Sequence, residues 1–353
     1  MSKLLPYLKL AVDKNGSDLF FSVGAPPMLK IEGVMMAVGK ILLTPQTLGE
    51  LVDDAVTPQQ REKLSRDLEL DLALHVGTLG RFRVNLFHQR GHVGMVLRHV
   101  KADIPTLDDV AAPEVLKSLS LLKRGLILVV GATGSGKSTT LAAMIRHRNH
   151  SGGGHILTVE DPIEFLHPNH QCIVNQREVG QDTASFERAL ASALREAPDI
   201  VMVGEIRTRE VMDACVQLAN TGHLALSSLH ANNAAQALQR VVNLYPADRR
   251  QQLYLDLSLT LRAIVSQRLV RTKDGRRCAA YEVLINTPFV QELILTQRID
   301  EIQNVMDQSS SNGMQTFDQS LHELWKSGKI ELSEALDNAD SRSNLEARIA
   351  FGG

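Results

Sequence analysis

Two patterns of apolar and polar residues follow one another along the chain. The first pattern consists of short β-rich runs, at residues 18–23, 68–76, 80–89 and 94–100. They surround a helical stretch near residues 44–67, which together predict a small α+β domain over residues 1–100. The next residues are polar and contain one proline, and the pattern changes after them. We therefore place an interdomain linker at residues 101–112.

The second pattern begins at residue 113 and continues to residue 353. Its apolar runs do not alternate with polar residues, and they lie at residues 126–130, 155–159, 199–203 and 223–229. Segments of helical period separate them, as in a parallel sheet whose two faces are both buried. The pattern predicts an α/β domain.

Apolar positions also predict individual helices in this domain. They recur at helical spacing at Phe186, Ala189, Leu190, Ala193 and Leu194. This stripe predicts a helix that Ser185 opens and that stops before Pro198. Residues 248–270 predict a second, long helix through Leu257, Leu261, Ile264 and Val265. After Gln291 the chain is mostly helical and polar, and we expect residues 338–353 to form a frayed tail.

Composition narrows the class of protein. The 353 residues are 44% hydrophobic, which suits about two folded domains. The net charge of −2 offers no overall field that would recruit nucleic acid or an anionic membrane. No run of 18 apolar residues and no secretory signal is evident, so we expect a cytoplasmic protein without a transmembrane segment. The three cysteines are widely spaced, which argues against a disulfide framework and a four-thiolate zinc site.

A glycine-rich segment follows the first of these apolar runs. The segment matches the pattern G-x-x-x-x-G-K-[ST] at Gly131, Gly136, Lys137 and Ser138, and it lies between a strand-like and a helix-like run. Such glycines let backbone N–H groups turn toward phosphates, while Lys137 reaches the β- and γ-phosphates and Ser138 binds Mg²⁺. The alternative is an incidental glycine turn, which the Lys-Ser pair and both flanks disfavour. The sequence therefore predicts a nucleotide phosphate cradle.

Carboxylates are expected at the same edge of the sheet. Glu205 ends the apolar strand of residues 199–205 and is the Walker B candidate, since ligands of open α/β sheets gather at the carboxyl ends of strands. Glu160, Asp161 and Glu164 follow another buried strand, and one of them could polarise the attacking water. Each carboxylate taken alone could equally be a solvated loop charge.

Histidines and arginines complete the candidate residues. His223 and His230 bracket a strand-like run at a spacing that does not suggest zinc. The plain interpretation is that both are hydrogen-bonded core residues. The functional interpretation is that they are neutral donors that sense the γ-phosphate. Arg81 and Arg83 alternate on one face of a strand. They could form surface salt bridges or act in trans as arginine fingers.

Along the chain the glycine-rich segment comes first, followed by the segment of Glu160 to Glu164, then Glu205, then the two histidines. This order of motifs resembles that of the type II/IV secretion ATPase superfamily. The chain looks most like the twitching-motility (type IV pilus retraction) ATPases of the PilT and PilU type. The likeness covers nearly the whole chain, including residues 17–33, 80–85 and 285–288. It implies a PAS-like N-terminal domain, a RecA-like P-loop ATPase domain and a ring-shaped homohexamer, with the nucleotide held between domains.

The resemblance also implies the role of each residue, with ATP and Mg²⁺ as cofactors. The nucleotide-binding residues would be Gly131, Ala132, Thr133, Gly134, Ser135, Gly136, Lys137, Ser138, Thr139, Glu160, Asp161 and His223. The catalytic residues would be Glu164, Glu205, His230 and the arginines Arg81, Arg83 and Arg98. The Mg²⁺ ligands would be Ser138 and Glu205.

The sequence departs from the family pattern at two places. Ala231 stands where the family's His box often has threonine, and residues 289–302 differ from the "AIRNLI"-like helix of PilT members. The second departure makes the chain similar to the PilU type, which is thought to assist a PilT motor. The tetracysteine zinc site of the pilus-assembly ATPases is missing.

We therefore expect a hexameric ATPase that couples hydrolysis of Mg-ATP to type IV pilus retraction. The resemblance implies a cytoplasmic ring, peripheral at the inner membrane, which acts with a PilT-type paralogue and a platform protein and binds no nucleic acid. One alternative is a nucleotide-binding regulatory subunit with little hydrolysis of its own. Another is an ATPase of type II secretion or conjugation.

Overall fold

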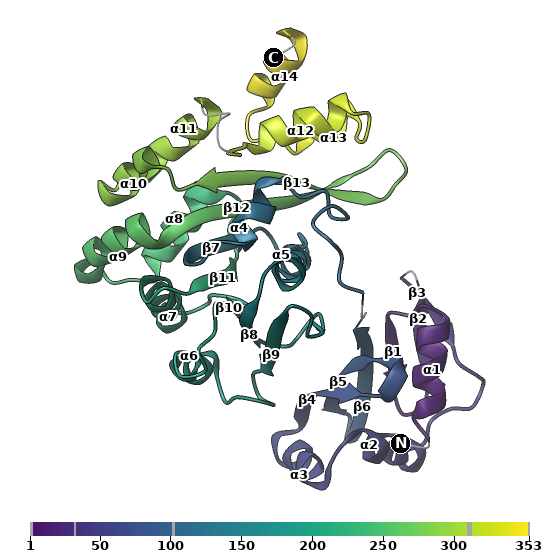
Figure 1. The fold of residues 1–353 in the computed structure, drawn as a ribbon. Helices are drawn as coiled ribbons and strands as arrows, with labels where there is room; N and C mark the ends of the chain where they lie inside the picture. Colours follow the sequence, from purple (N-terminus) through teal and green to yellow (C-terminus); the bar gives the residue numbers. More distant parts are fainter. Residues whose placement is uncertain (1–2, 32, 101–102, 309–312, 352–353) are drawn as a thin grey trace. The chain divides into compact units, whose positions relative to one another are not determined.

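The chain divides into two units, Met1–Asp103 and Ile104–Gly353 (Figure 1). The structure is a computed structural model and describes residues 3–31, 33–100, 103–308 and 313–351. Lys101 and Ala102 of the expected linker lie outside the described residues.

An antiparallel sheet forms the centre of the N-terminal unit, in the order β3-β2-β1-β6-β5-β4. Its strands are β1 (Asp18–Phe21), β2 (Met28–Ile31), β3 (Val34–Ala37), β4 (Glu69–His75), β5 (Arg81–Gln89) and β6 (His92–Val100). The helices of the unit are α1 (Leu5–Asp13), α2 (Pro45–Ala55) and α3 (Pro58–Asp67). The predicted strand runs and the α+β class are confirmed. The single helical stretch is in fact two helices, because Thr57 caps a new helix that Pro58 opens.

The C-terminal unit is built on a seven-stranded sheet in the order β13-β12-β7-β11-β10-β8-β9. Its strands are β7 (Gly125–Val130), β8 (Gly154–Glu160), β9 (Cys172–Glu178), β10 (Ile200–Val203), β11 (Leu224–Leu229), β12 (Leu261–Arg271) and β13 (Arg277–Ile285). All neighbours pair in parallel except β12 and β13. Every residue of β7, β10 and β11 is buried, so the prediction of a parallel sheet covered on both faces is confirmed.

Helices cover the two faces of this sheet in separate groups (Figure 1). One core contains α4 (Val115–Ser120) and α5 (Lys137–Ser151). The other contains α6 (Phe186–Ala193), α7 (Arg209–Asn220), α8 (Ala234–Asn243), α9 (Ala247–Thr260), α10 (Pro288–Leu295) and α11 (Ile302–Gln308). Alternate residues of β7 enter the two cores, because successive side chains of a strand point to opposite faces. The helix expected after Ser185 is α6, and the Ser185 hydroxyl caps it.

The long helix predicted for residues 248–270 is wrong. A helix, α9, ends at Thr260, and the chain then forms β12, which lies between β13 and β7. Leu261, Ile264 and Val265 are fully buried in that internal strand. A short apolar run buried on both faces suits either a helix or a strand, and here pairing with β7 decides it.

The frayed tail predicted for residues 338–353 is also wrong. Three helices follow residue 313: α12 (Phe317–Lys326), α13 (Leu332–Asp337) and α14 (Arg342–Phe351). They form a small core with the β12–β13 hairpin, in which Leu345 of α14 is fully buried. Within the described ranges no helix is both long and apolar enough to span a bilayer.

Candidate nucleotide site

The glycine-rich loop lies between the end of β7 and the start of α5 (Figure 1). Gly134 and Gly136 have φ angles of +76° and +91°, which favour glycine. A Cβ atom on Gly136 would lie 2.8 Å from Nε2 of Gln267, and one on Gly131 would lie 2.6 Å from the carbonyl oxygen of Gln267. The loop is therefore packed against β12 and leads into a helix N-terminus, the arrangement that binds phosphate groups.

Lys137 is the first residue of α5 and is almost buried. Its ammonium group donates hydrogen bonds to the carbonyl oxygens of Gly131 and Ala132, both at 2.9 Å. Burial lowers the pKa of Lys137, and the charges of Glu205 and Glu164 oppose that shift. Both carboxylates therefore act on this ammonium group, although they follow different strands.

A cavity of about 360 Å³ lies beside the loop. Among the candidate residues, the structure brings to it Thr133, Gly134, Lys137, Ser138, Glu160, Asp161, Glu164, Glu205 and His230. They come from α5 and its preceding loop and from the segments where β8, β10 and β11 end, as expected for the carboxyl ends of parallel strands. Gly136 and Thr139 line a neighbouring cavity. In the part of the chain that the structure describes, the buried hydroxyl of Ser135 has no hydrogen-bond partner.

Two basic side chains hold Glu205 in the cavity. Oε1 of Glu205 lies 3.1 Å from Nε2 of His230, and Oε2 lies 2.9 Å from Nη2 of Arg207. The side chain of Glu205 is only 20% exposed, so this geometry fixes the direction of its carboxylate. A residue at this position can hold a cation or orient water.

Glu160 is buried at the end of β8. Its carboxylate accepts hydrogen bonds from the Thr158 hydroxyl (2.7 Å), the Gln176 amide (3.1 Å) and the backbone N–H of Glu164 (3.3 Å). Burial raises the pKa of Glu160 above its ordinary value, and these hydrogen bonds offset only part of that rise. Glu160 thus holds the segment that carries Glu164, whereas Glu164 itself is exposed at the cavity.

His223 is not brought to the cavity within one chain. It precedes β11, whereas His230 follows the same strand, so the two histidines lie at opposite edges of the sheet. The Nδ1 atom of His223 lies 3.1 Å from the Thr221 hydroxyl and 3.2 Å from the carbonyl oxygen of Leu218. These contacts match the plain interpretation of a hydrogen-bonded structural histidine.

The three arginines lie in the N-terminal unit, on β5 and β6. Arg81 and Arg83 alternate with buried residues, and Arg83 is directly opposite Arg98 in the sheet. The Nε atom of Arg98 donates to a carboxylate oxygen of the buried Asp18 at 2.7 Å. Arg98 therefore has a structural ion pair in its own sheet.

Two basic side chains that line the cavity were missed from the sequence. Arg207 stands two positions beyond Glu205, and that spacing is a signal that could have found it. His167 lines the cavity three residues beyond Glu164 and is almost buried, which lowers its pKa to about 4 and keeps it neutral. A single histidine in the loop between β8 and β9 carries no pattern that would have identified it.

Oxygen ligands for a divalent cation line the same cavity, namely the Ser138 hydroxyl and the carboxylates of Glu205 and Glu164. Such ligands suit Mg²⁺. In residues 3–31, 33–100, 103–308 and 313–351, no three His, Cys, Asp or Glu side chains gather into a metal site of their own. Mg²⁺ bound to a nucleotide commonly completes its coordination with phosphate oxygens and water.

Comparisons with known proteins agree with this geometry. Residues 57–345 match the family described as type II/IV secretion system protein. The chain is 51% identical to the type IV pilus ATPase PilU of Pseudomonas aeruginosa, over 98% of this chain and 91% of that protein. It is 39% identical to the type IV pilus retractation ATPase PilT of the same organism, over 96% and 98% of the two chains. These matches confirm the resemblance inferred from the motifs.

A solved structure shares the fold as well. The crystal structure of the pilus retraction motor PilT with bound ADP is 38% identical to this chain and superposes with a TM-score of 0.91. The superposition covers 98% of this chain and 99% of that one.

Proposed function

The chain belongs to the type II/IV secretion system protein family and is an ATPase, and from that premise we propose that it drives retraction of a type IV pilus. The observation that carries this proposal is the 51% identity with a type IV pilus ATPase over nearly the full length of both chains. The cavity beside the glycine-rich loop supports it, since it combines a phosphate-binding lysine with carboxylates and a histidine.

In the proposed reaction, the ammonium of Lys137 exchanges the loop carbonyls for the β- and γ-phosphate oxygens of ATP. The N–H groups at the start of α5 bind the same phosphates. Glu164 orients the attacking water and accepts its proton. Mg²⁺, held by Ser138 and Glu205, supplies positive charge to the transferring phosphoryl group when bound.

His230 and Arg207 keep the carboxylate of Glu205 in place during this step. Loss of the γ-phosphate changes the charge that faces Glu205, and His230 responds to that change through its contact with Glu205. In this proposal His230 passes the hydrolysis state on to the loop that follows β11.

The active assembly in this proposal is a homohexamer at the inner membrane. It acts with a PilT-type paralogous ATPase on an inner-membrane platform protein. Arg81, Arg83 and Arg98 of one subunit stabilise the charge that develops at the nucleotide of a neighbour. Arg98 exchanges Asp18 for phosphate when it does so, because Asp18 binds it in the single chain.

Replacement of Lys137 by alanine is the first test. Lys137→Ala removes the charge that grips the phosphates, so we expect the rate of Mg-ATP hydrolysis to fall by at least about a hundredfold. Steady-state phosphate release by purified protein of checked oligomeric state measures it. The exposed Lys123 gives a matched control, because Lys123→Ala keeps the cavity intact. No turnover by the wild-type protein would overturn the autonomous motor.

A second candidate function is a nucleotide-holding subunit that couples to a paralogous motor. The altered segment of residues 289–302 favours it, and α10 within that segment exposes Phe289 and Leu295. A Glu205→Gln strain separates the two. Retraction that survives this substitution but not deletion of the gene would mean that the subunit acts by binding, and loss of retraction in both strains would support the motor.

A further inference from the structure

The segment of residues 230–234 joins the end of β11 to the start of α8. His230, at its first position, contacts Glu205. Its last position is fixed by Glu282 of β13, whose Oε1 accepts hydrogen bonds from the N–H of Ala234 (2.7 Å) and the hydroxyl of Ser266 (2.8 Å). Glu282 is fully buried, so these contacts hold the start of α8 firmly against the β12–β13 hairpin.

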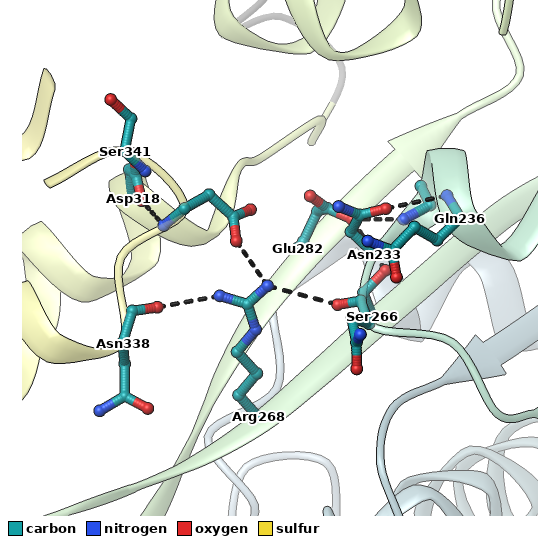
Figure 2. A network of polar contacts seen from close by, with 11 residues as sticks. Asn233, Gln236, Ser266, Arg268, Glu282, Asp318, Asn338 and Ser341 are labelled. Atoms are coloured by element: carbon teal, nitrogen blue, oxygen red, sulfur yellow. Dashed lines mark hydrogen bonds and ion pairs between the residues drawn. The ribbon is translucent and has the colours of Figure 1, made fainter. Parts of the chain in front are cut away.

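Arg268 of β12 contacts the middle of the same segment. Its Nη2 atom lies 3.4 Å from the carbonyl oxygen of Asn232 and 2.5 Å from a carboxylate oxygen of Asp340. Its Nη1 atom donates to the carbonyl oxygen of Asn338 at 2.9 Å, and the guanidinium carbon lies 3.9 Å from the centre of the Phe317 ring. Figure 2 shows Arg268 between Asn338 on one side and Ser266 and Asn233 on the other.

The position of Asp340 is itself set by the C-terminal helices. The carboxylate of Asp318, at the start of α12, accepts hydrogen bonds from the N–H groups of Asp340 (2.8 Å) and Ser341 (3.1 Å). The α12, α13 and α14 helices pack together on the β12–β13 hairpin. A continuous set of contacts therefore runs from these helices through Arg268 to residues 230–234.

We propose that Arg268 is a positioning residue for ATP hydrolysis, which holds the His230 segment through Asn232 and ties it to the C-terminal helices through Asp340. This inference rests on the role proposed above for His230. Neither Arg268 nor Asp340 lines the cavity around Lys137. Displacement of the C-terminal helices, by a neighbour or a partner, therefore changes the rate of hydrolysis and leaves nucleotide affinity alone.

Asp340→Asn is the first variant, because it removes the charge of Asp340 and keeps its backbone bond to Asp318. We expect kcat to fall about tenfold while KM and the Kd of a fluorescent ADP analogue stay within about twofold. Asp337→Asn is the matched control. It removes a carboxylate of the same C-terminal segment, which pairs with Arg342 at 3.6 Å and is exposed, and we expect no change. Wild-type kcat in Asp340→Asn would overturn the inference.

Arg268→Lys is the second variant. Lysine keeps the positive charge and the pairing with Asp340, but it lacks the fork that reaches Asn338, Asp340 and Asn232 together. We expect a loss of kcat similar to that of Asp340→Asn. Equal decreases in kcat and nucleotide affinity would mean general damage to the fold and would contradict a positioning role.

The background of His230→Ala separates positioning from plain stabilisation. If Arg268 acts through His230, Asp340→Asn lowers kcat in the wild-type background and has no further effect when His230 is already alanine. Independent, multiplicative effects would overturn the inference. An unchanged kcat in His230→Ala alone would overturn both this inference and the role proposed for His230, while hydrolysis by the wild-type protein would leave the ATPase itself standing.

Amide hydrogen exchange gives a readout that needs no turnover. Asp340→Asn should increase exchange in the peptide of residues 231–236, since the N–H of Ala234 is held only while α8 stays against Glu282. The Asp337→Asn control should leave that peptide unchanged. Unaltered exchange in Asp340→Asn would mean that Asp340 does not hold the segment, and would overturn the proposal.

Discussion

Glu282 has a carboxyl group that is fully buried on β13, in the sheet of the C-terminal unit. Burial raises its pKa to about 7, against hydrogen bonds from Ala234 and Ser266 and the nearby charge of Arg268, which lower it. Within the described residues its Oε2 atom has no hydrogen-bond partner. Ionisation therefore leaves a charge that the surroundings stabilise poorly, and below about pH 7 the folded protein keeps the carboxyl neutral.

This preference predicts how stability changes with pH. Below about pH 4.5, Glu282 is neutral in both the folded and the unfolded chain. Between about 4.5 and 7 the unfolded chain loses the proton that the folded chain keeps, so the free energy of unfolding falls as the pH rises, by on the order of 3 kcal/mol in all. Above pH 7 the cost stays constant.

Glu282→Gln should remove this pH dependence. The amide oxygen can accept the same two hydrogen bonds and cannot ionise, so the stability of the variant relative to the wild type should rise from pH 5 to about pH 7 and stay level from there to pH 8. Urea denaturation of both proteins at several pH values measures the difference. A constant difference across that range would contradict a carboxyl that stays protonated in the fold.

At the scale of elements, burial explains which predictions succeeded. The β7, β10 and β11 strands were predicted because their apolar runs are buried on both faces, and α6 because it has a regular stripe and a serine cap. The strand β12 was not predicted, because its apolar run continues from that of α9. Only the pairing of these residues with β7 makes them a strand. Such pairing joins residues far apart in the sequence and leaves no local pattern.

Leu345 provides a test of the C-terminal element that the sequence did not predict. The side chain is fully buried in the small core of α12, α13 and α14, so Leu345→Ala should lower the free energy of unfolding by about 2–5 kcal/mol. Leu332 of α13 is 39% exposed, and Leu332→Ala should cost clearly less. Denaturant unfolding of both variants measures this, and equal midpoints would speak against an ordered C-terminal helix.

The candidate site was predictable to the extent that strand ends define it. Lys137, Glu164, Glu205 and His230 share one cavity because parallel strands end at one edge of the sheet. His223 shares the sequence motif, but it lies at the other end of β11. Partners that depend on packing, such as the hold of Glu160 on the Glu164 segment, have no signature in a single sequence.

At the scale of the whole molecule, the candidate charged residues are divided between two units. The C-terminal unit contains the cavity, and within the described part of the chain Arg207 is the one arginine that lines it, already paired with Glu205. Arg81, Arg83 and Arg98 belong to the N-terminal unit. If neighbouring subunits supply them, hydrolysis is a property of the assembly.

A mixing experiment tests that division. Lys137→Ala and Arg83→Ala should each be inactive alone, yet mixed rings should recover part of the turnover. In such rings an intact Arg83 of one subunit meets an intact Lys137 of another. Native mass spectrometry verifies that mixed rings form. Rings that form and remain inactive would contradict an arginine supplied in trans.

Three consecutive residues of β12 link parts of the protein that a sequence comparison would treat as separate motifs. Gln267 accepts a hydrogen bond from Thr140 of α5 and packs against the glycine-rich loop. The side chains of Ser266 and Arg268 face the other side, where Arg268 contacts Asn232 and Ser266 donates to Glu282, which in turn accepts from the N–H of Ala234. A chimera that exchanged only the glycine-rich loop between relatives would therefore keep its glycines and lose the surface on which they fit. The exchangeable module is the loop together with its β12 neighbours, and protein engineering on this scaffold has to move them as one piece.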